Sequence, residues 1–270
     1  MAQRTLMLSD THLGRPKHAA LSAEALRPLW GGCTRLIING DVAEVHHPTH
    51  WTMAARQTLR LFDLCEEDGV QLTLLSGNHD PYIADQRHLH LAQGSVFVTH
   101  GDVMHPAIAP WSPRAGRMRE RREQALSAIP LKDRHTLEAR LTAAQHASHG
   151  DWEHLSAEAG RSTIGAMLLR PWAMAQVLWY WREFPSVAAK FIREHAPQAR
   201  FAVLGHTHRP GIWSFGELTI INTGSFGFPG RPRAVMIEDD QVLRVLDIVH
   251  NAGAYGFGVK PVAQFELPCC

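Results

Sequence analysis

The segment TLMLSDTHLG, from Thr5 to Gly14, contains the pattern from which the fold can be predicted. Its apolar run, Thr5–Leu8, is typical of a strand buried on both faces, and a polar turn with Asp10 and His12 follows. The same order returns at Leu36–Ile38 before NGDV, Val70–Leu75 before SGNHD, Val96–Thr99 before HGD, and Phe201–Leu204 before GHTH. Ligands gather at the carboxyl ends of strands in α/β sheets, so these turns are expected to form the functional edge.

The segments between these runs indicate an α/β class. Residues Trp51–Glu67 have an apolar side at helical spacing, and Gly69 is expected to end that helix. After GHTH, short apolar runs separated by Gly, Pro or acidic turns predict antiparallel strands: Ile212–Phe215, Leu218–Ile221, Ala234–Ile237 and Val242–Ile248. We therefore expect a mixed-sheet α/β core flanked by helices.

Between Pro110 and Pro197 the sequence has no strand pattern, and it predicts several helices separated by prolines. We interpret it as a helical insert, or cap, between two halves of one catalytic core. The expected division is a first half of the core at 1–109, the insert at 110–197, a second half at 198–250 and a C-terminal tail at 251–270. The ending ELPCC is expected to be a disordered end with free thiols.

Composition excludes several classes of protein. The 270 residues carry 27 basic and 26 acidic side chains, a formal net charge of +1, so binding to a nucleic-acid polymer is not expected. Four cysteines in a chain of this length make neither a disulfide scaffold nor a zinc site. The start, MAQRTLMLSD, lacks the apolar core of a signal peptide, and the apolar part of Ile164–Trp181 is too short to span a bilayer. We expect a cytoplasmic location.

Histidine is the anomaly, with 18 residues, several of them beside Asp, Asn or Gly in the polar turns. Asp10 and His12 are two positions apart, which on an extended backbone would point both side chains the same way. The candidate ligands at the functional edge are Asp10, His12, Asp41, Asn78, His100, His206 and His208. Carboxylate, amide and imidazole together suit Mn²⁺, our first choice, or Fe or Zn²⁺. The set exceeds the needs of one ion, so we expect two divalent metal ions.

The ordered series D-x-H, G-D, G-N-H-D, H-G-D and G-H-x-H resembles the calcineurin-like metallophosphoesterase superfamily. The resemblance covers Asp10 to His208 except for the insert, and implies an αββα sandwich that hydrolyses phosphoester or pyrophosphate bonds. It implies three groups of metal ligands: Asp10, His12 and His208 for one ion, Asn78, His100 and His206 for the other, and Asp41 as the bridge. His79 would protonate the leaving group. Either Glu44 or Asp80 would orient His79, and the sequence leaves that choice open.

The insert begins with a basic stretch, PRAGRMRERR. On a helix, Arg114, Arg117 and Arg121 would share a face, either as a clamp for a second phosphate or as a solvated face neutralised by neighbouring acids. His105, soon after HGD, is a further candidate for binding phosphate, with a solvated loop as the alternative.

The end of the insert is strongly apolar, through Met167, Leu168, Trp172, Met174, Leu178, Trp179 and Trp181. The favoured interpretation is a buried core of the insert, and the alternative is a groove for acyl chains or a peripheral contact with membrane lipid. The layout is similar to that of UDP-2,3-diacylglucosamine pyrophosphatases, which usually carry Arg where this chain has His79. A phosphate-containing small molecule or lipid-linked substrate is therefore the first hypothesis. The alternatives are a soluble phosphodiesterase or phosphomonoesterase acting on nucleotides or small phosphoesters, and a catalytically silent scaffold.

Overall fold

The structure is a computed structural model that describes residues 3–16, 19–152, 171–227 and 230–268. Its strands form two sheets. The six-stranded sheet has the order β11-β10-β9-β1-β2-β3, with β11 at Ala254–Glu266, β10 at Val242–Asn251, β9 at Arg233–Glu238, β1 at Arg4–Leu8, β2 at Arg35–Asn39 and β3 at Gln71–Leu75. The five-stranded sheet has the order β4-β5-β6-β8-β7, with β4 at His88–Leu91, β5 at Val96–Thr99, β6 at Phe201–Leu204, β8 at Leu218–Asn222 and β7 at Gly211–Phe215.

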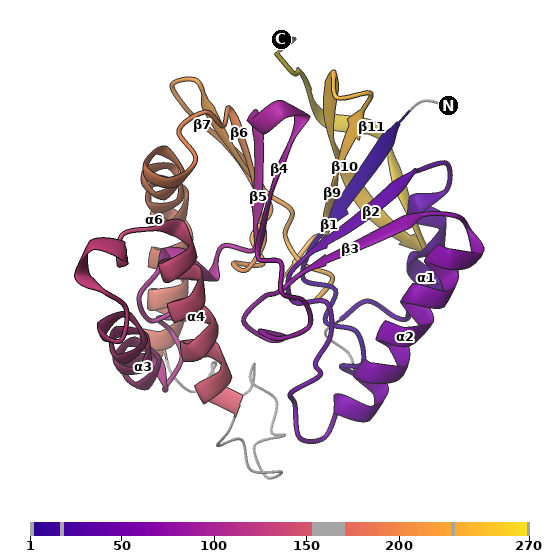
Figure 1. Cartoon of the computed structure of the whole chain (residues 1–270). Helices are drawn as coiled ribbons and strands as arrows, with labels where there is room; N and C mark the ends of the chain where they lie inside the picture. The colour runs from indigo at the N-terminus through magenta and orange to yellow at the C-terminus, as the bar shows by residue number, and fades with distance from the viewer. Residues whose placement is uncertain (1–2, 17–18, 153–170, 228–229, 269–270) are drawn as a thin grey trace.

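The two sheets face each other, and helices cover their outer faces (Figure 1). Helices α1 (Ala23–Leu26) and α2 (Trp51–Glu67) lie on the six-stranded sheet. Helices α3 (Ala115–Ser127), α4 (Leu137–Trp152) and α6 (Pro171–His195) lie on the side of the five-stranded sheet. This arrangement confirms the expected αββα sandwich.

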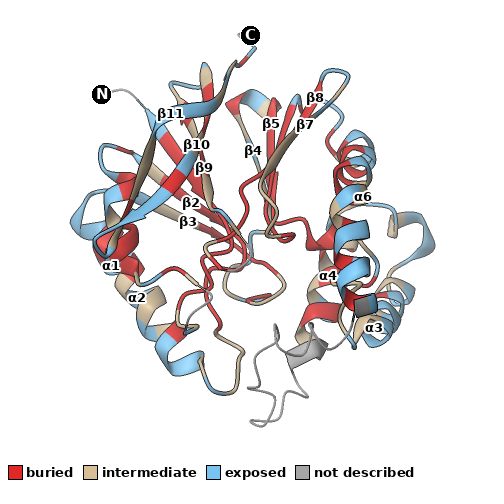
Figure 2. Cartoon of the chain, turned by 180° about the vertical axis from the view of Figure 1, so that it is seen from behind, coloured by how far each residue is buried: buried red, intermediate tan, exposed pale blue. Residues whose placement is uncertain are grey.

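Apolar strands buried on both faces hold the layers together. Met7 and Ile37 of the first sheet pack in one cluster with Val98 and Val203 of the second, so the middle of the core lies between the sheets. The other faces of the same strands pack against the helices: Leu6 of β1 joins the α1–α2 cluster, and other residues join the α6 cluster. The deep red of the central strands in Figure 2 shows this burial. Continuous apolar runs therefore correctly predicted two-sided burial.

Several elements follow the sequence signals closely. Helix α2 spans Trp51–Glu67 as expected, and Gly69 just beyond it has φ of +67°, the left-handed conformation that commonly ends helices. The strands expected before the polar turns are all present. Strand β4 and the short α1 were not predicted, since HLHL is too short a run to stand out and α1 is only one turn long.

Three expectations are wrong. The tail proposed for 251–270 is instead strand β11 over Ala254–Glu266, which pairs along β10 and forms the edge of the first sheet. Strand β8 pairs in parallel with β6, although it is antiparallel to β7. The apolar face of α6 is not wholly buried. Trp172, Leu178 and Trp179 are more than half exposed, because a single row of α6 residues, which includes Tyr180 and Phe184, meets the core.

The ends of other predicted segments lie outside the described residues, among them Met167, Leu168 and the terminal Cys269–Cys270. Within the part of the chain that the structure describes, none of the helices combines the length and the apolar character that a bilayer span requires.

Candidate metal centre

The candidate ligands lie on loops that leave the carboxyl ends of strands in both sheets (Figure 1). Five of them have left-handed backbones, with φ of +50° at Asp10, +47° at His12, +50° at Asp41, +68° at His206 and +57° at His208. The argument from an extended backbone was therefore wrong, although its conclusion holds. Left-handed residues other than glycine each cost on the order of 1 kcal/mol and cluster at functional sites, so the tight turns themselves mark this edge.

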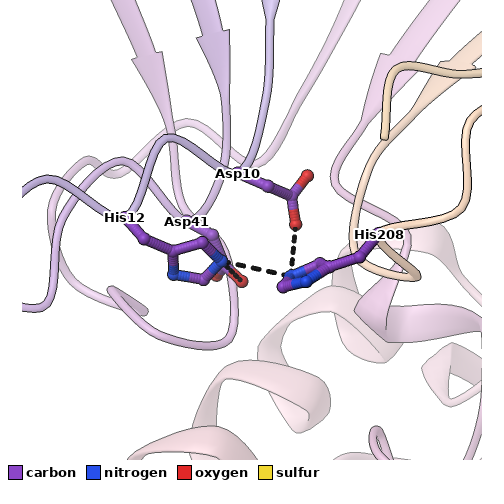
Figure 3. Close-up of side chains that lie close together, drawn as sticks. All are labelled: Asp10, His12, Asp41 and His208. Atoms are coloured by element: carbon purple, nitrogen blue, oxygen red, sulfur yellow. Dashed lines mark hydrogen bonds and ion pairs between the residues drawn. The ribbon is translucent and has the colours of Figure 1, made fainter. Parts of the chain in front are cut away.

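Four of these side chains converge on one point (Figure 3). Their ligand atoms, from Asp10, His12, Asp41 and His208, all lie within 4.8 Å of one another. The Nε2 of His208 is 3.3 Å from Oδ1 of Asp10 and 3.1 Å from Nε2 of His12. Two imidazole nitrogens at that separation beside two carboxylates are the arrangement expected around a shared cation. The residues present therefore fit a divalent metal.

A second group lies on the other side of Asp41. The Oδ1 of Asn78 is 2.7 Å from Nδ1 of His206 and 3.3 Å from Nε2 of His100. The same His100 nitrogen is 3.4 Å from Oδ2 of Asp41, and Nε2 of His12 is 3.7 Å from that oxygen. One carboxylate oxygen thus stands between the two groups. Asp41 has the position that a bridging ligand needs.

The outer nitrogens of three of these rings have fixed partners. The Nδ1 of His12 is 3.0 Å from Oε1 of Glu44. The Nδ1 of His100 is 2.9 Å from the carbonyl of Asn39, and the Nε2 of His206 is 3.1 Å from the carbonyl of Ile108. Such partners orient histidine ligands and select the tautomer that leaves the inner nitrogen unprotonated. The three rings are therefore preorganised to bind metal.

The charges of the site also favour cation binding. Burial would raise the pKa of the Asp41 carboxyl, but the charges of His100 and His79 outweigh it and hold that pKa well below its usual value. Burial would lower the pKa of His100, but Asp41 in turn raises it well above its usual value, so a metal ion that binds His100 would displace a proton from it. Burial lowers the pKa of His206 to about 3, so its imidazole is neutral at physiological pH. An ionised carboxylate and a neutral imidazole are the forms in which both residues bind metals.

Two glycines allow the ligands to approach the backbone closely. A Cβ at Gly40, where φ is +76°, would lie 2.4 Å from Nδ1 of His100. A Cβ at Gly77 would lie 2.3 Å from Oδ1 of Asp41. Neither distance is tolerable for carbon, so the glycines of the G-D and G-N-H-D motifs make room for ligands.

Asp80 has a structural position beneath these loops. Its carboxylate accepts backbone N–H groups from Gly77 at 2.8 Å, Asp41 at 3.1 Å, Val42 at 2.5 Å and Ala43 at 3.2 Å. These bonds fasten the loop after β3 to the loop after β2. Asp80 therefore holds the backbone of two ligand loops, and its described bonds are not to the His79 ring.

Glu44 is the residue beside the ring of His79. Its Oε2 is 3.2 Å from Nδ1 of His79, and its Oε1 accepts from His12 and from Nη1 of Arg15 at 3.4 Å. These atoms of His12, Glu44 and His79 also lie close enough to hold an ion. Because each ring meets Glu44 through Nδ1, we interpret the carboxylate as the acceptor that orients both rings.

His79 is suited to hold a proton in the metal-free protein. Burial alone would lower its pKa, but the charges of Glu44 and Asp41 and the hydrogen bond to Glu44 raise it to about 9. Its ring lies edge-on to the ring of His12, with centroids 4.8 Å apart. A protonated imidazole therefore stands next to the candidate metal ligands.

The remaining candidates for binding phosphate are His105, which precedes the insert, and three arginines of the basic stretch within it. His105 packs edge-on against Tyr180, and its Nδ1 accepts the N–H of Ala107. Arg114 lies just before α3, and Arg117 and Arg121 lie within it. Their role in binding phosphate stays a prediction.

Several residues around the site were not identified from the sequence. Arg15 contacts Glu44, and the carbonyls of Asn39 and Ile108 orient ligand histidines. Ile108 has φ of +55°, which is rare for a β-branched residue. Contacts made by backbone carbonyls leave no signal in the residue type. Arg15, however, directly follows D-x-H-L-G, so its position next to the motif could have been noticed.

Comparisons with known proteins give distant structural likenesses. A predicted phosphoesterase from Streptococcus pneumoniae is 15% identical, with 98% of both chains covered and a TM-score of 0.39. Vps29 from Entamoeba histolytica, complexed with Zn²⁺, is 12% identical, with 98% of this chain and 99% of its own covered and a TM-score of 0.46. YfcE, a phosphoesterase from E. coli, is 17% identical, with 98% of this chain and 100% of its own covered and a TM-score of 0.45. No family model and no curated protein matches the chain. At these TM-scores we take no functional argument from the likenesses.

Proposed function

We propose that this protein hydrolyses phosphoester or pyrophosphate bonds with two divalent cations. The observation that carries the proposal is the position of Asp41, whose Oδ2 lies between the His12 group and the His100 group. Asp10, His12 and His208 would hold one ion, and Asn78, His100 and His206 the other. When bound, such a pair of ions activates water and neutralises charge on phosphate.

The side chains supply the rest of the reaction. His79, held at Nδ1 by Glu44, donates a proton from Nε2 to the oxygen of the leaving group. Glu44 fixes the ring and stabilises its protonated form, which the raised pKa reflects. No nucleophilic side chain is needed, because water attacks phosphorus.

Mn²⁺ is our first choice of metal, with Fe and Zn²⁺ as alternatives, since the ligands are imidazoles, carboxylates and one amide. A lipid-linked substrate, such as a UDP-diacylglucosamine, is favoured by one observation. Trp172, Met174 and Trp179 are exposed on α6, and aromatic side chains of this kind collect at membrane interfaces. We propose a peripheral lipid contact there.

The test begins with purified protein stripped of metal by a chelator. It is reconstituted separately with Mn²⁺, Zn²⁺ and Fe²⁺ and assayed on bis-p-nitrophenyl phosphate, p-nitrophenyl phosphate and a UDP-linked lipid with and without detergent. We expect about two ions per chain, the number the two ligand groups predict. We also expect turnover of at least one ester that is lost in Asp41→Asn. His90→Asn, a histidine change on the exposed side of β4, is the matched control and keeps both properties.

Two outcomes would contradict the proposal. Metal content near zero under all conditions would show that the side chains do not form a metal centre. Full metal content without hydrolysis of any ester would favour the alternative of a catalytically silent scaffold.

A further inference from the structure

A cleft lies between the insert helix α6 and the start of β7. Its volume is about 520 Å³, and its lining residues are Leu178, Trp181, Arg182, Arg209 and Trp213. This volume falls in the range of about 300–1,000 Å³ typical of small-molecule sites. None of these five residues belongs to the candidate metal centre.

The cleft adjoins the loop that carries two candidate metal ligands. Trp181 donates its Nε1–H to the carbonyl of Thr207, at 2.8 Å, and Thr207 stands between His206 and His208. Arg209 directly follows His208. A molecule in the cleft would therefore lie beside the candidate metal centre.

Contacts within the protein hold the part of the cleft wall formed by Arg209, Trp181 and Trp213. Arg209 donates from Nη1 to the carbonyl of Trp181, at 2.6 Å, and its guanidinium lies 5.7 Å from the centroid of the Trp213 ring. Gly211 permits this arrangement, because a Cβ there would lie 2.1 Å from the Trp213 ring. A guanidinium held at both a carbonyl and an indole is preorganised, which lowers the entropy cost of binding.

Within the described part of the chain, no carboxylate pairs with the positive charges in the cleft. Among the described residues, neither Arg182 nor Arg209 forms an ion pair with a carboxylate. Two guanidinium groups in one cleft favour an anion, and bidentate contacts with phosphate are their common use. An acyl chain would desolvate both groups without replacing their hydrogen bonds with water, which is costly. The chemistry therefore favours an anionic ligand with a flat apolar part.

We propose that this cleft binds the nucleoside phosphate part of a nucleotide-linked substrate. The base would lie against the indole of Trp181, and Arg182 and Arg209 would bind phosphate oxygens. Stacking on an aromatic ring is a common mode of base recognition. The inference rests on the proposed function for its place in catalysis, but binding in the cleft does not require hydrolysis.

The test measures binding to the full-length metal-free protein, so that it is independent of activity. Titration calorimetry with AMP and UMP is compared with inorganic phosphate and with adenosine. We expect saturable binding of the nucleotides with a Kd at or below about 1 mM, and weaker binding of phosphate and adenosine alone. Arg182→Ala should weaken nucleotide binding about tenfold, the effect of losing one charge-assisted hydrogen bond.

Lys190→Ala is the matched control, since it removes one positive charge from the exposed side of the same helix. Its AMP affinity should stay within about twofold of wild type, since exposed charges more than a Debye length apart interact weakly. Nuclear magnetic resonance of the indole N–H signals provides a second measurement, in which AMP should shift the Trp181 signal.

Three results would overturn the proposal. The first is an affinity for AMP no higher than the affinity for inorganic phosphate, and the second is an equal loss of AMP affinity in Arg182→Ala and Lys190→Ala. The third is displacement of AMP by short-chain phosphatidic acid that binds more tightly, which would assign the cleft to lipid. Nucleotide binding that depends on Arg182 in a protein without hydrolytic activity would refute the proposed function and leave this inference standing. Hydrolysis of p-nitrophenyl esters without nucleotide binding would refute this inference and leave the proposed function standing.

Discussion

Replacing Glu44 with Gln should remove the proton from His79 at mildly alkaline pH. The side chain of Glu44 is 1% exposed and lies 3.2 Å from Nδ1 of His79, whose pKa is raised from 6.5 to about 9. That rise corresponds to roughly 3 kcal/mol in favour of the imidazolium. Two unit charges about 4 Å apart interact by about 4 kcal/mol at an effective dielectric constant of 20, so the Glu44 charge is large enough to account for it.

The expected result is a pKa of His79 that falls by at least about one unit, toward 6.5. At pH 8 the ring would then change from about nine-tenths protonated at a pKa of 9 to about 3% at 6.5. Titration of the His79 ring signals in metal-free protein by nuclear magnetic resonance measures this directly. Glu24→Gln, which changes an exposed carboxylate paired with Arg60, is the control and leaves the His79 titration unchanged.

The free energy of unfolding should also depend on the protonation of His79. Because the pKa of His79 is raised in the folded protein, its contribution is fully present below about pH 6.5 and is lost as pH rises through about 9. Solvent reaches a quarter of the side chain, so the loss should not exceed roughly 3 kcal/mol. Urea unfolding of wild type and His79→Asn across this range isolates the contribution of His79. For the Glu44→Gln variant, a His79 pKa within half a unit of the wild-type value would refute the conclusion that Glu44 keeps His79 protonated.

Three further changes test the rest of the site. Gly40→Ala should displace the His100 ring and reduce bound metal by about one ion per chain, because the new Cβ would meet Nδ1 at 2.4 Å. Gly216→Ala has a similar φ of +63° but open space around it, and elemental analysis should show normal metal content. Asp41→Asn should weaken both metal sites, and equilibrium dialysis would speak against a bridging role if only one ion were lost. His79→Asn should keep both ions but slow hydrolysis of esters with poor leaving groups by about 10²–10⁴-fold, and equal slowing with p-nitrophenolate would contradict its role as acid.

The sequence by itself determined the elements and the chemistry at their ends. The limits of α2, the buried strands and the identity of the candidate ligands could be predicted because apolar periodicity and turn residues act between neighbours in the chain. The αββα arrangement followed from the resemblance carried by five ordered motifs.

Only the tertiary structure decided how distant residues pair. Glu44, rather than Asp80, meets the His79 ring, because the four N–H groups beneath the loops occupy the carboxylate of Asp80. The exposure of Trp179 and the contact of Arg209 with α6 also depend on how the helix is set against the sheet. Side chains 28 or more residues apart meet only through the order of strands and layers, and nothing in the local pattern of either partner specifies that order.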